Sequence, residues 1–358
     1  MGPANISPIR ANTSPVRSVF ELGTPWATVD PFLFCVHHND AYPAGNGELA
    51  PAASLSGRQI GSDFSGRDGW SMYHGEAVPG FPQHPHRGFE TITFVRRGYV
   101  DHSDSLRAAA RYGAGDVQWL TAGAGIVHAE MFPLLRADGG NHLELFQIWL
   151  NLPRVDKMAE PHFAMLWAED IPVCDEVDAA GRRVQITVVA GALGDHIAPR
   201  PPPSSWASRP DSDVAVWRVL LEPDASWTLP PANPGTVRSI YVFDGGGLLV
   251  GTQMIGCGHG AVVDASAPVD IRADGRGVTF LLLQGRPIDE PVAQYGPFVM
   301  NDRAGIEGAF RDYQTTGFGG WPWPNDAPTH GQAAARFARR PGHALELPPG
   351  AGRASVVG

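Results

Sequence analysis

Cysteine is scarce in this chain of 358 residues. Its three cysteines, Cys35, Cys174 and Cys257, form no C-x-x-C pair. Structural zinc sites are usually built from such pairs, so the sequence argues against a structural zinc centre. Few cysteines without a pairing pattern are also typical of a reducing compartment, and we therefore expect a cytoplasmic protein.

The sequence also lacks a basic run. Its net charge is −10, and the longest basic clusters are the Arg pairs at 96–97, 182–183 and 339–340. A surface that follows a nucleic-acid backbone needs many more cationic side chains than these pairs supply. We therefore expect no direct binding to nucleic acid.

Long apolar runs are missing as well. No stretch approaches the roughly 20 apolar residues that a membrane-spanning helix needs. The first thirty residues hold no continuous apolar signal core. A myristoylation motif is absent, because Pro3 follows Gly2 and Ile6 stands where Ser or Thr is required. The sequence thus predicts no membrane segment and no lipid anchor.

Glycine and proline, in contrast, are abundant. The 43 glycines and 33 prolines together make up about a fifth of the chain, while 43% of the residues remain apolar. This composition favours a turn-rich β-protein over a disordered chain or a helix bundle. The length suits two domains, each with a core of its own.

Short strand candidates recur in two sets, at 90–152 and at 214–284, and a Pro-rich break at 200–203 precedes the second set. Short strands separated by glycine turns predict closed barrels or jelly rolls, so we expect an all-β fold with two similar domains in tandem. The expected parts, in chain order, are a flexible arm (1–24), a first β-domain (25–175) with a long Gly/Pro/Ser-rich insertion (37–80), a second β-domain (176–315) and an irregular tail (316–358).

One segment near the C-terminus has the periodicity of a helix. Ile306, Phe310 and Tyr313 recur at helical spacing, which predicts a short helix from Asp302 to Tyr313. Asn301 or Asp302 can cap its start, and Gly317 can end it.

Two short motifs carry potential metal ligands: His84-Pro85-His86 and His128-Ala129-Glu130. Residues i and i+2 of a strand point to the same face, so each motif presents two ligands in one direction. Three imidazoles and a carboxylate suit Fe(II), Mn(II), Ni(II) or Zn(II), and a six-coordinate ion would keep about two positions open. The motifs therefore predict a reactive metal site.

The identity of the acidic ligand is open at this point. Glu90 lies four residues after His86, an even offset that keeps it on the histidine face of a regular strand. Glu130 lies two residues after His128. A third pair, His142 and Glu144, repeats the spacing but sits in a run typical of a plain amphipathic strand.

Four segments resemble the signature segments of the pirin family, which are bicupin proteins of the cupin superfamily. These segments are HPHRGFETITF, GDVQWLTAGAGIVHAEM, LFQIWLNLPRVDKMAEPHF and YGPFVMND. The resemblance implies two tandem cupin (jelly-roll) β-barrels, face to face, with one metal ion in the first barrel. By motif, it places the metal on His84, His86, His128 and Glu130, and makes Glu90 a candidate for a residue that orients a histidine. The second barrel, which has no H-x-H motif, is expected to be metal-free.

The resemblance also implies a function. Several bacterial pirins resemble quercetin 2,3-dioxygenases, which suggests a small aromatic or flavonol substrate, O2 and Fe(II), with Mn, Ni, Cu, Co or Zn as other possible ions. Glu130 would act as general base. Candidates for the pocket walls are Phe34, His37, His38, Phe89 and Trp119. The alternative that the family suggests is a non-catalytic, iron-dependent redox regulator that binds a protein partner.

The insertion at 37–80 departs from the family pattern. Family members usually pass quickly from the strand that starts at Asp30-Pro31-Phe32 to the H-x-H motif, whereas this chain inserts a segment with His37, His38 and many glycines. Loops at a barrel mouth influence which ligand enters. His37 or His38 is therefore a candidate acid or base in the pocket.

Overall fold

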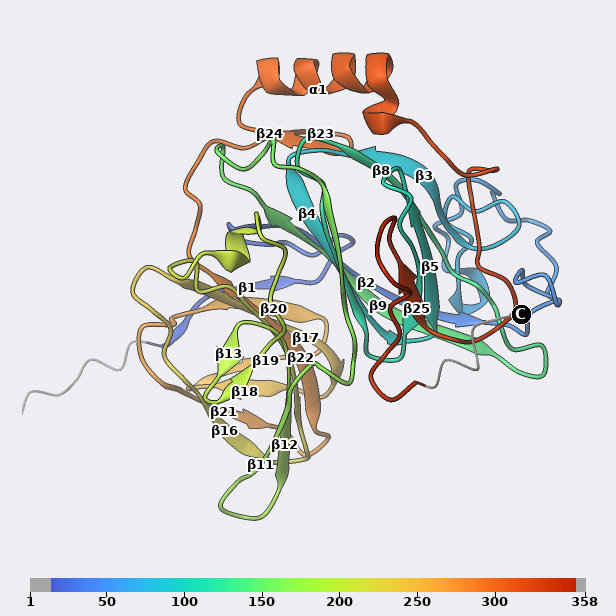
Figure 1. Ribbon diagram of the computed structural model, residues 1–358. Coiled ribbons are helices and arrows are strands. Elements are labelled where there is room, and N and C mark those ends of the chain that lie inside the picture. The colour runs from blue at the N-terminus through green and yellow to red at the C-terminus, as the bar shows by residue number, and fades with distance from the viewer. Residues whose placement is uncertain (1–13, 352–358) are drawn as a thin grey trace, which may run out of the picture.

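The computed structural model describes residues 14–351, which form two β-barrels and one α-helix (Figure 1). This confirms the expected all-β class with a tandem arrangement and a short helix near the C-terminus. No helix within the described range is long and apolar enough to cross a membrane.

The first barrel consists of two five-stranded antiparallel sheets. In spatial order, one sheet contains β10 (His162–Leu166), β7 (Val117–Thr121), β4 (Phe89–Arg97), β9 (Asn141–Asn151) and β2 (Phe32–Tyr42). The other sheet contains β25 (Phe337–Arg339), β6 (Ala109–Gly113), β5 (Tyr99–Asp104), β8 (Ile126–Met131) and β3 (Gly80–His86).

The second barrel consists of a seven-stranded and a four-stranded sheet. In spatial order, the larger sheet contains β1 (Val16–Glu21), β20 (His259–Val263), β17 (Val237–Gly245), β22 (Val278–Gly285), β15 (Ala215–Leu221), β12 (Arg183–Ala190) and β11 (Val173–Val177). The smaller sheet contains β16 (Ser226–Leu229), β21 (Val269–Ala273), β18 (Leu248–Val250) and β19 (Gln253–Ile255). Two-stranded ribbons are formed by β13 (Ala192–Leu193) with β14 (His196–Ile197) and by β23 (Ala293–Tyr295) with β24 (Phe298–Met300). Short 3-10 turns lie at η1 (Arg67–Gly69), η2 (Trp206–Ser208) and η3 (Gly317–Gly319).

The two barrels pack face to face through a shared apolar core. Side-chain alternation assigns each strand's residues to the two faces of its sheet. On β4, Ile92 and Phe94 pack in this shared core, whereas Thr93 and Val95 face the interior of the first barrel. The contributions of the two barrels include Trp119, Phe146 and Ile148 from the first and Val216, Tyr241 and Leu281 from the second. The opposite faces of the first barrel's sheets enclose a separate interior, which holds a second apolar cluster and also polar side chains such as Thr93.

The expected flexible arm at 1–24 is only in part consistent with the structure. Residues Val16–Glu21 form β1, which pairs antiparallel with β20 and joins the second barrel (Figure 1). Phe20 is half-buried, and its ring lies edge-on to Tyr241, with 6.0 Å between ring centroids, so this side chain anchors a strand whose other residues are mostly exposed. Residues 1–13 of the expected arm lie outside the described range.

Two other segments also differ from expectation. The strand β2 continues to Tyr42, so His37 and His38 lie on a regular strand paired with β9 and not in the loop of the insertion. In the tail that was expected to be irregular, β25 pairs with β6 and extends a sheet of the first barrel. Both strands are specified by a partner distant in sequence, which a local pattern does not reveal.

The predicted helix is confirmed as α1 (Arg303–Thr316), which starts one residue later and ends three residues later than expected. Asp302 is its N-cap, and its carboxylate accepts a hydrogen bond of 2.8 Å from the Gly305 N–H. Gly317 ends it with a left-handed backbone (φ 55°), which glycine adopts at low cost. Asp312, on this helix, forms an ion pair of 2.7 Å with the buried Arg87. Arg87 is the residue that directly follows β3. The helix thus supports the end of the strand that carries the H-x-H motif.

Candidate metal centre

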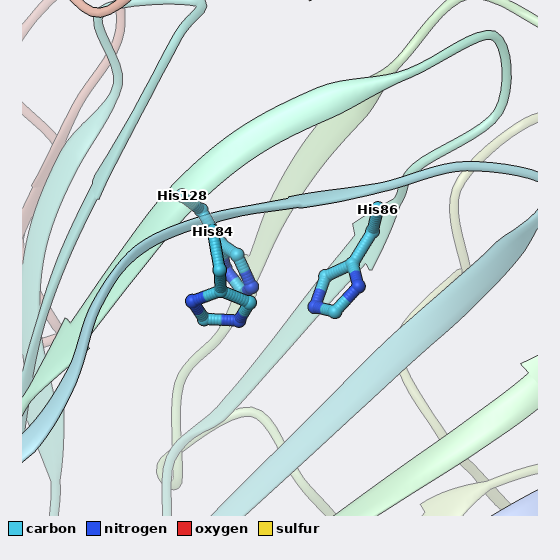
Figure 2. Close-up of side chains that lie close together, drawn as sticks. All are labelled: His84, His86 and His128. Atoms are coloured by element: carbon cyan, nitrogen blue, oxygen red, sulfur yellow. The ribbon is translucent and has the colours of Figure 1, made fainter. Parts of the chain in front are cut away.

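Three imidazoles meet inside the first barrel (Figure 2). His84 and His86 project from β3, and His128 projects from the neighbouring β8, directly opposite His84 in the strand register. Ring centroids are 4.5 Å apart for His84 and His128, and 4.9 Å apart for His86 and His128. One nitrogen from each ring lies within 4.8 Å of the others. The strand pairing therefore places the three rings within reach of one ion.

His128 provides the clearest test of whether this cluster suits a metal. Its side chain is fully buried, and neither ring nitrogen has a hydrogen-bond partner. Leaving a buried polar group without a partner costs roughly 1–3 kcal/mol. A metal ion bonded to one of these nitrogens would remove part of that cost, so the residues present fit a metal.

The protonation states of the three histidines also suit metal binding. Burial lowers the pKa of His84 to about 4 and holds the pKa values of His86 and His128 well below the usual range. The rings are therefore neutral at physiological pH, which is the form that binds a metal. The Nδ1–H of His84 donates to the Pro82 carbonyl over 2.8 Å, which leaves Nε2 of that ring as its ligand atom.

Glu130 lies beside the three histidines but not within their close group. Its buried carboxylate accepts hydrogen bonds from Thr93 Oγ1 at 2.9 Å and Gln147 Nε2 at 2.8 Å, and a longer one from Tyr112 at 3.4 Å. Burial raises its pKa. The structure thus holds a carboxylate of raised proton affinity at the histidine cluster; its service as fourth ligand stays a prediction.

Glu90 does not orient a histidine, contrary to the expectation. Its carboxylate accepts hydrogen bonds from Thr121 Oγ1 at 2.7 Å and Ser205 Oγ at 2.6 Å, on the side of the sheet that faces the second barrel. The even offset from His86 is misleading because Gly88, with φ at 85°, turns the chain between β3 and β4. Glu90 therefore belongs to the contact between the barrels.

Glu90 makes stability depend on pH. Burial raises its pKa from 4.5 to about 7, so between these values the folded protein keeps a proton that the unfolded chain releases. Its contribution to stability is full below pH 4.5 and is lost as the pH rises through about 7. Relative to Glu90→Gln, the wild type should lose about 3 kcal/mol of unfolding free energy between acidic and mildly alkaline pH. Urea unfolding of both proteins at each pH measures this difference.

The same substitution tests the choice of the acidic ligand. Because Glu90 lies on the face away from the histidines, Glu90→Gln should retain the full metal content, measured by elemental analysis. Loss of metal in this variant alone would overturn the choice of Glu130.

A cavity of about 500 Å³ opens next to the histidine cluster and includes His84, His86 and Glu130 in its wall. Most of the remaining wall is apolar or aromatic. These side chains are Phe34, Phe81, Pro82, Phe132, Leu145 and Trp149. The other polar side chains in the wall are His38, His74, Gln83, Thr93 and Gln147.

Of the residues expected in the pocket, the structure places Phe34 and His38 in the cavity wall. His37 does not line it: the alternation of β2 turns its ring onto Phe146, and its Nε2 pairs with Glu144 at 3.1 Å. Phe89 and Trp119 do not line it either. Phe89 is buried behind Trp149, with 4.2 Å between ring centroids, and Trp119 lies in the core between the barrels.

Several site residues were not anticipated. Gln147 and Trp149 share a face of β9, and the alternation of that strand could have indicated them. His102 lies 5.5 Å from His128 between ring centroids, and its Nε2 hydrogen-bonds to Asp104 at 3.0 Å. The H-x-D spacing at 102–104 repeats the same-face pattern of the metal motifs and was an available signal.

The third motif, His142 with Glu144, lies outside the site. Nε2 of His142 hydrogen-bonds to Asn39 Oδ1 at 2.6 Å, and Glu144 pairs with Arg96 as well as with His37. Both side chains therefore belong to polar contacts on the other face of β9.

Comparisons with known proteins agree with this architecture. The family model Pirin matches residues 16–150, and the model of the pirin C-terminal cupin domain matches residues 216–319. A Pseudomonas aeruginosa protein, provisionally named a quercetin 2,3-dioxygenase, is 34% identical over 305 residues, or 85% of this chain and 92% of that protein. Pirin-1 of Arabidopsis thaliana is 36% identical over 245 residues, or 66% of this chain and 77% of that protein.

Among solved structures, a quercetin 2,3-dioxygenase from Acinetobacter baumannii is similar, with a TM-score of 0.63 and 29% identity. The similarity covers 81% of this chain and 86% of that one. The two barrels are thus two cupin domains, and the chain belongs to the pirin family.

Proposed function

We propose that this protein is a metal-dependent dioxygenase that opens the central ring of a flavonol with O2. The observation that carries the proposal is the cavity of about 500 Å³, which joins two of the clustered histidines and a buried carboxylate to an aromatic wall. Cavities of this size and polarity are typical of sites for small aromatic ligands. The names of the relatives agree with this substrate class.

His84, His86 and His128 would hold the ion, with Glu130 as the fourth donor. We propose Fe(II); Mn, Ni, Cu, Co and Zn also suit imidazole and carboxylate ligands, and availability decides between them. When bound, the ion supplies Lewis acidity that favours a deprotonated substrate hydroxyl, and access to redox chemistry with O2.

Glu130 would take the proton of the substrate hydroxyl as general base. Hydrogen bonds from Thr93 and Gln147 fix the orientation of its carboxylate. Phe81 and Trp149 would hold the planar rings and exclude water. Both atoms of O2 enter the ring-opened ester, and one ring carbon leaves as carbon monoxide.

The regulator interpretation has less support. A redox-sensing site can be sealed, whereas a substrate needs a path to the metal ligands. His84 and His86 lie in the wall of a ligand-sized cavity, which favours the enzyme.

Oxygen uptake tests the proposal. Protein loaded with Fe(II) without oxygen should consume O2 when quercetin is added, and carbon monoxide should accumulate in the headspace. His128→Ala serves as the control and should show neither. Full iron occupancy without uptake in the wild type would reject quercetin cleavage at this site.

A further inference from the structure

Three side chains, His38, Tyr73 and Asp40, form a hydrogen-bonded series that starts at the cavity wall with His38. They have no part in the mechanism above. Nδ1 of His38, on β2, lies 2.8 Å from the Tyr73 hydroxyl. That hydroxyl donates to Asp40 Oδ2, also at 2.8 Å, and Asp40 Oδ1 accepts from the Ser71 N–H at 3.0 Å. Tyr73 and Ser71 come from the insertion between β2 and β3.

The direction of these hydrogen bonds fixes the tautomer of His38. The single hydroxyl proton of Tyr73 is given to Asp40, so the hydroxyl oxygen can only accept from His38. His38 therefore carries its proton on Nδ1, and burial lowers its pKa to about 4, which keeps the ring neutral. Nε2 is then a lone-pair acceptor, and no described residue hydrogen-bonds to it, while His38 lines the cavity.

Several contacts hold Tyr73 in place within the insertion. Tyr73 has a left-handed backbone (φ 56°), a conformation that costs free energy for a residue with a side chain. Its N–H and C=O form hydrogen bonds of 2.8 Å with the backbone of Asp63, whose carboxylate pairs with Arg58 at 2.9 Å. Its ring stacks on Phe81, with 5.2 Å between ring centroids. The strained conformation is thus fixed by several independent contacts.

His38 and the histidine cluster line the same cavity, but His38 is not one of the clustered histidines. The Phe81 ring lies next to both, with centroids 5.9 Å from His38 and 6.4 Å from His84. A planar ligand that lies along Phe81 could therefore meet the cluster with one oxygen and His38 with another.

We propose that His38, oriented by Tyr73 and Asp40, accepts a hydrogen bond from a second hydroxyl of the ligand. This inference rests on the proposed function and narrows its substrate class to planar polyphenols, with one hydroxyl for the metal and another remote from it. His38 is a specificity residue in this account, and Tyr73 and Asp40 are positioning residues.

Binding to two flavonols tests the proposal. Quercetin carries several hydroxyls, whereas 3-hydroxyflavone has the same ring skeleton with only the hydroxyl next to the carbonyl. With Fe(II)-loaded protein under argon, fluorescence titration should give a lower Kd for quercetin, by about tenfold. His38→Leu and Tyr73→Phe should remove most of this preference and leave the Kd of 3-hydroxyflavone within about twofold of wild type.

Phe34→Leu is the matched control, because it changes an apolar part of the same wall. It should weaken both flavonols to a similar extent and keep their ratio. The proposal is overturned if His38→Leu and Tyr73→Phe keep the wild-type ratio, if they weaken both ligands equally, or if the wild type binds neither flavonol.

The two proposals fail in different ways. A preference for quercetin that depends on His38, without oxygen uptake, would support the recognition site and reject the dioxygenase. Oxygen uptake with a ratio of Kd values that is unchanged in both variants would do the reverse.

Discussion

Replacing His128 by alanine is expected to strip the metal and leave the fold largely intact. His128 lies close to both of the other imidazoles and has no hydrogen bond to lose. Loss of a residue that merely supports a ligand lowers metal affinity 10–100-fold, so loss of the ligand itself should lower it about 100-fold or more. The dialysed variant should hold less than about a tenth of the metal bound by the wild type, measured by elemental analysis.

Thermal unfolding gives a second measure of the same variant. Metal that binds only the folded state stabilises it, by about 2.7 kcal/mol at a hundred times the Kd. Added Fe(II) should therefore raise the Tm of the wild type but not that of His128→Ala. His142→Ala, which changes an exposed histidine outside the cavity, should behave like the wild type in both assays. Full metal occupancy in His128→Ala would refute the ligand assignment.

Replacing Glu130 by glutamine should reduce turnover of a flavonol about 10²–10⁴-fold, because the variant has no carboxylate to take the substrate proton. Glutamine has the shape of glutamate, and its one oxygen can accept the Thr93 hydrogen bond, while the Gln147 amide has to turn to accept from the new NH2 group. The cavity should therefore keep its overall form. Metal affinity should fall about tenfold, because three imidazoles remain to hold the ion while a weaker donor replaces the carboxylate. Initial rates at saturating Fe(II) separate the two effects.

Glu90→Gln is the matched control for this experiment. It makes the same chemical change on β4, at a side chain that faces away from the cavity, and should keep wild-type turnover. Turnover by Glu130→Gln within about threefold of wild type would exclude Glu130 as the base, since general-base catalysis contributes at least about 100-fold.

The sequence predicted the histidine cluster because its geometry is local. Residues two apart on a strand share a face whatever the rest of the fold does, so His84 and His86 could be paired from spacing alone. His128 was added to them because its own H-x-E motif has the same spacing and because the family resemblance implies it; the pairing of β3 with β8, which brings His128 opposite His84, is a finding of the structure.

Several predictions about the surroundings of the histidines failed where they depended on tertiary structure. Glu90 kept an even offset from His86, but the turn at Gly88 places the two residues on different strands. The alternation of side chains along a strand predicts which residues share a face, but it does not predict which face points into the barrel. Trp119, expected in the cavity wall, lies between the barrels, whereas Trp149, which was not expected there, lines the cavity.

The insertion shows the same limit. His38 was a candidate acid or base from the sequence, but its partners Tyr73 and Asp40 are brought together only by the path of the chain from β2 to β3. Nothing in the local pattern around Tyr73 predicts its left-handed backbone, because residues of that size rarely adopt it.

One ion held by His84, His86 and His128 should meet a flavonol in this cavity. Crystals grown without oxygen with Fe(II) and quercetin, measured at the iron absorption edge, would locate both. We expect an anomalous peak bonded by the three imidazoles and in contact with an oxygen of the flavonol, whose rings lie along Phe81. An anomalous peak at any other group of side chains, or a flavonol bound elsewhere while this cavity stays empty, would contradict this expectation.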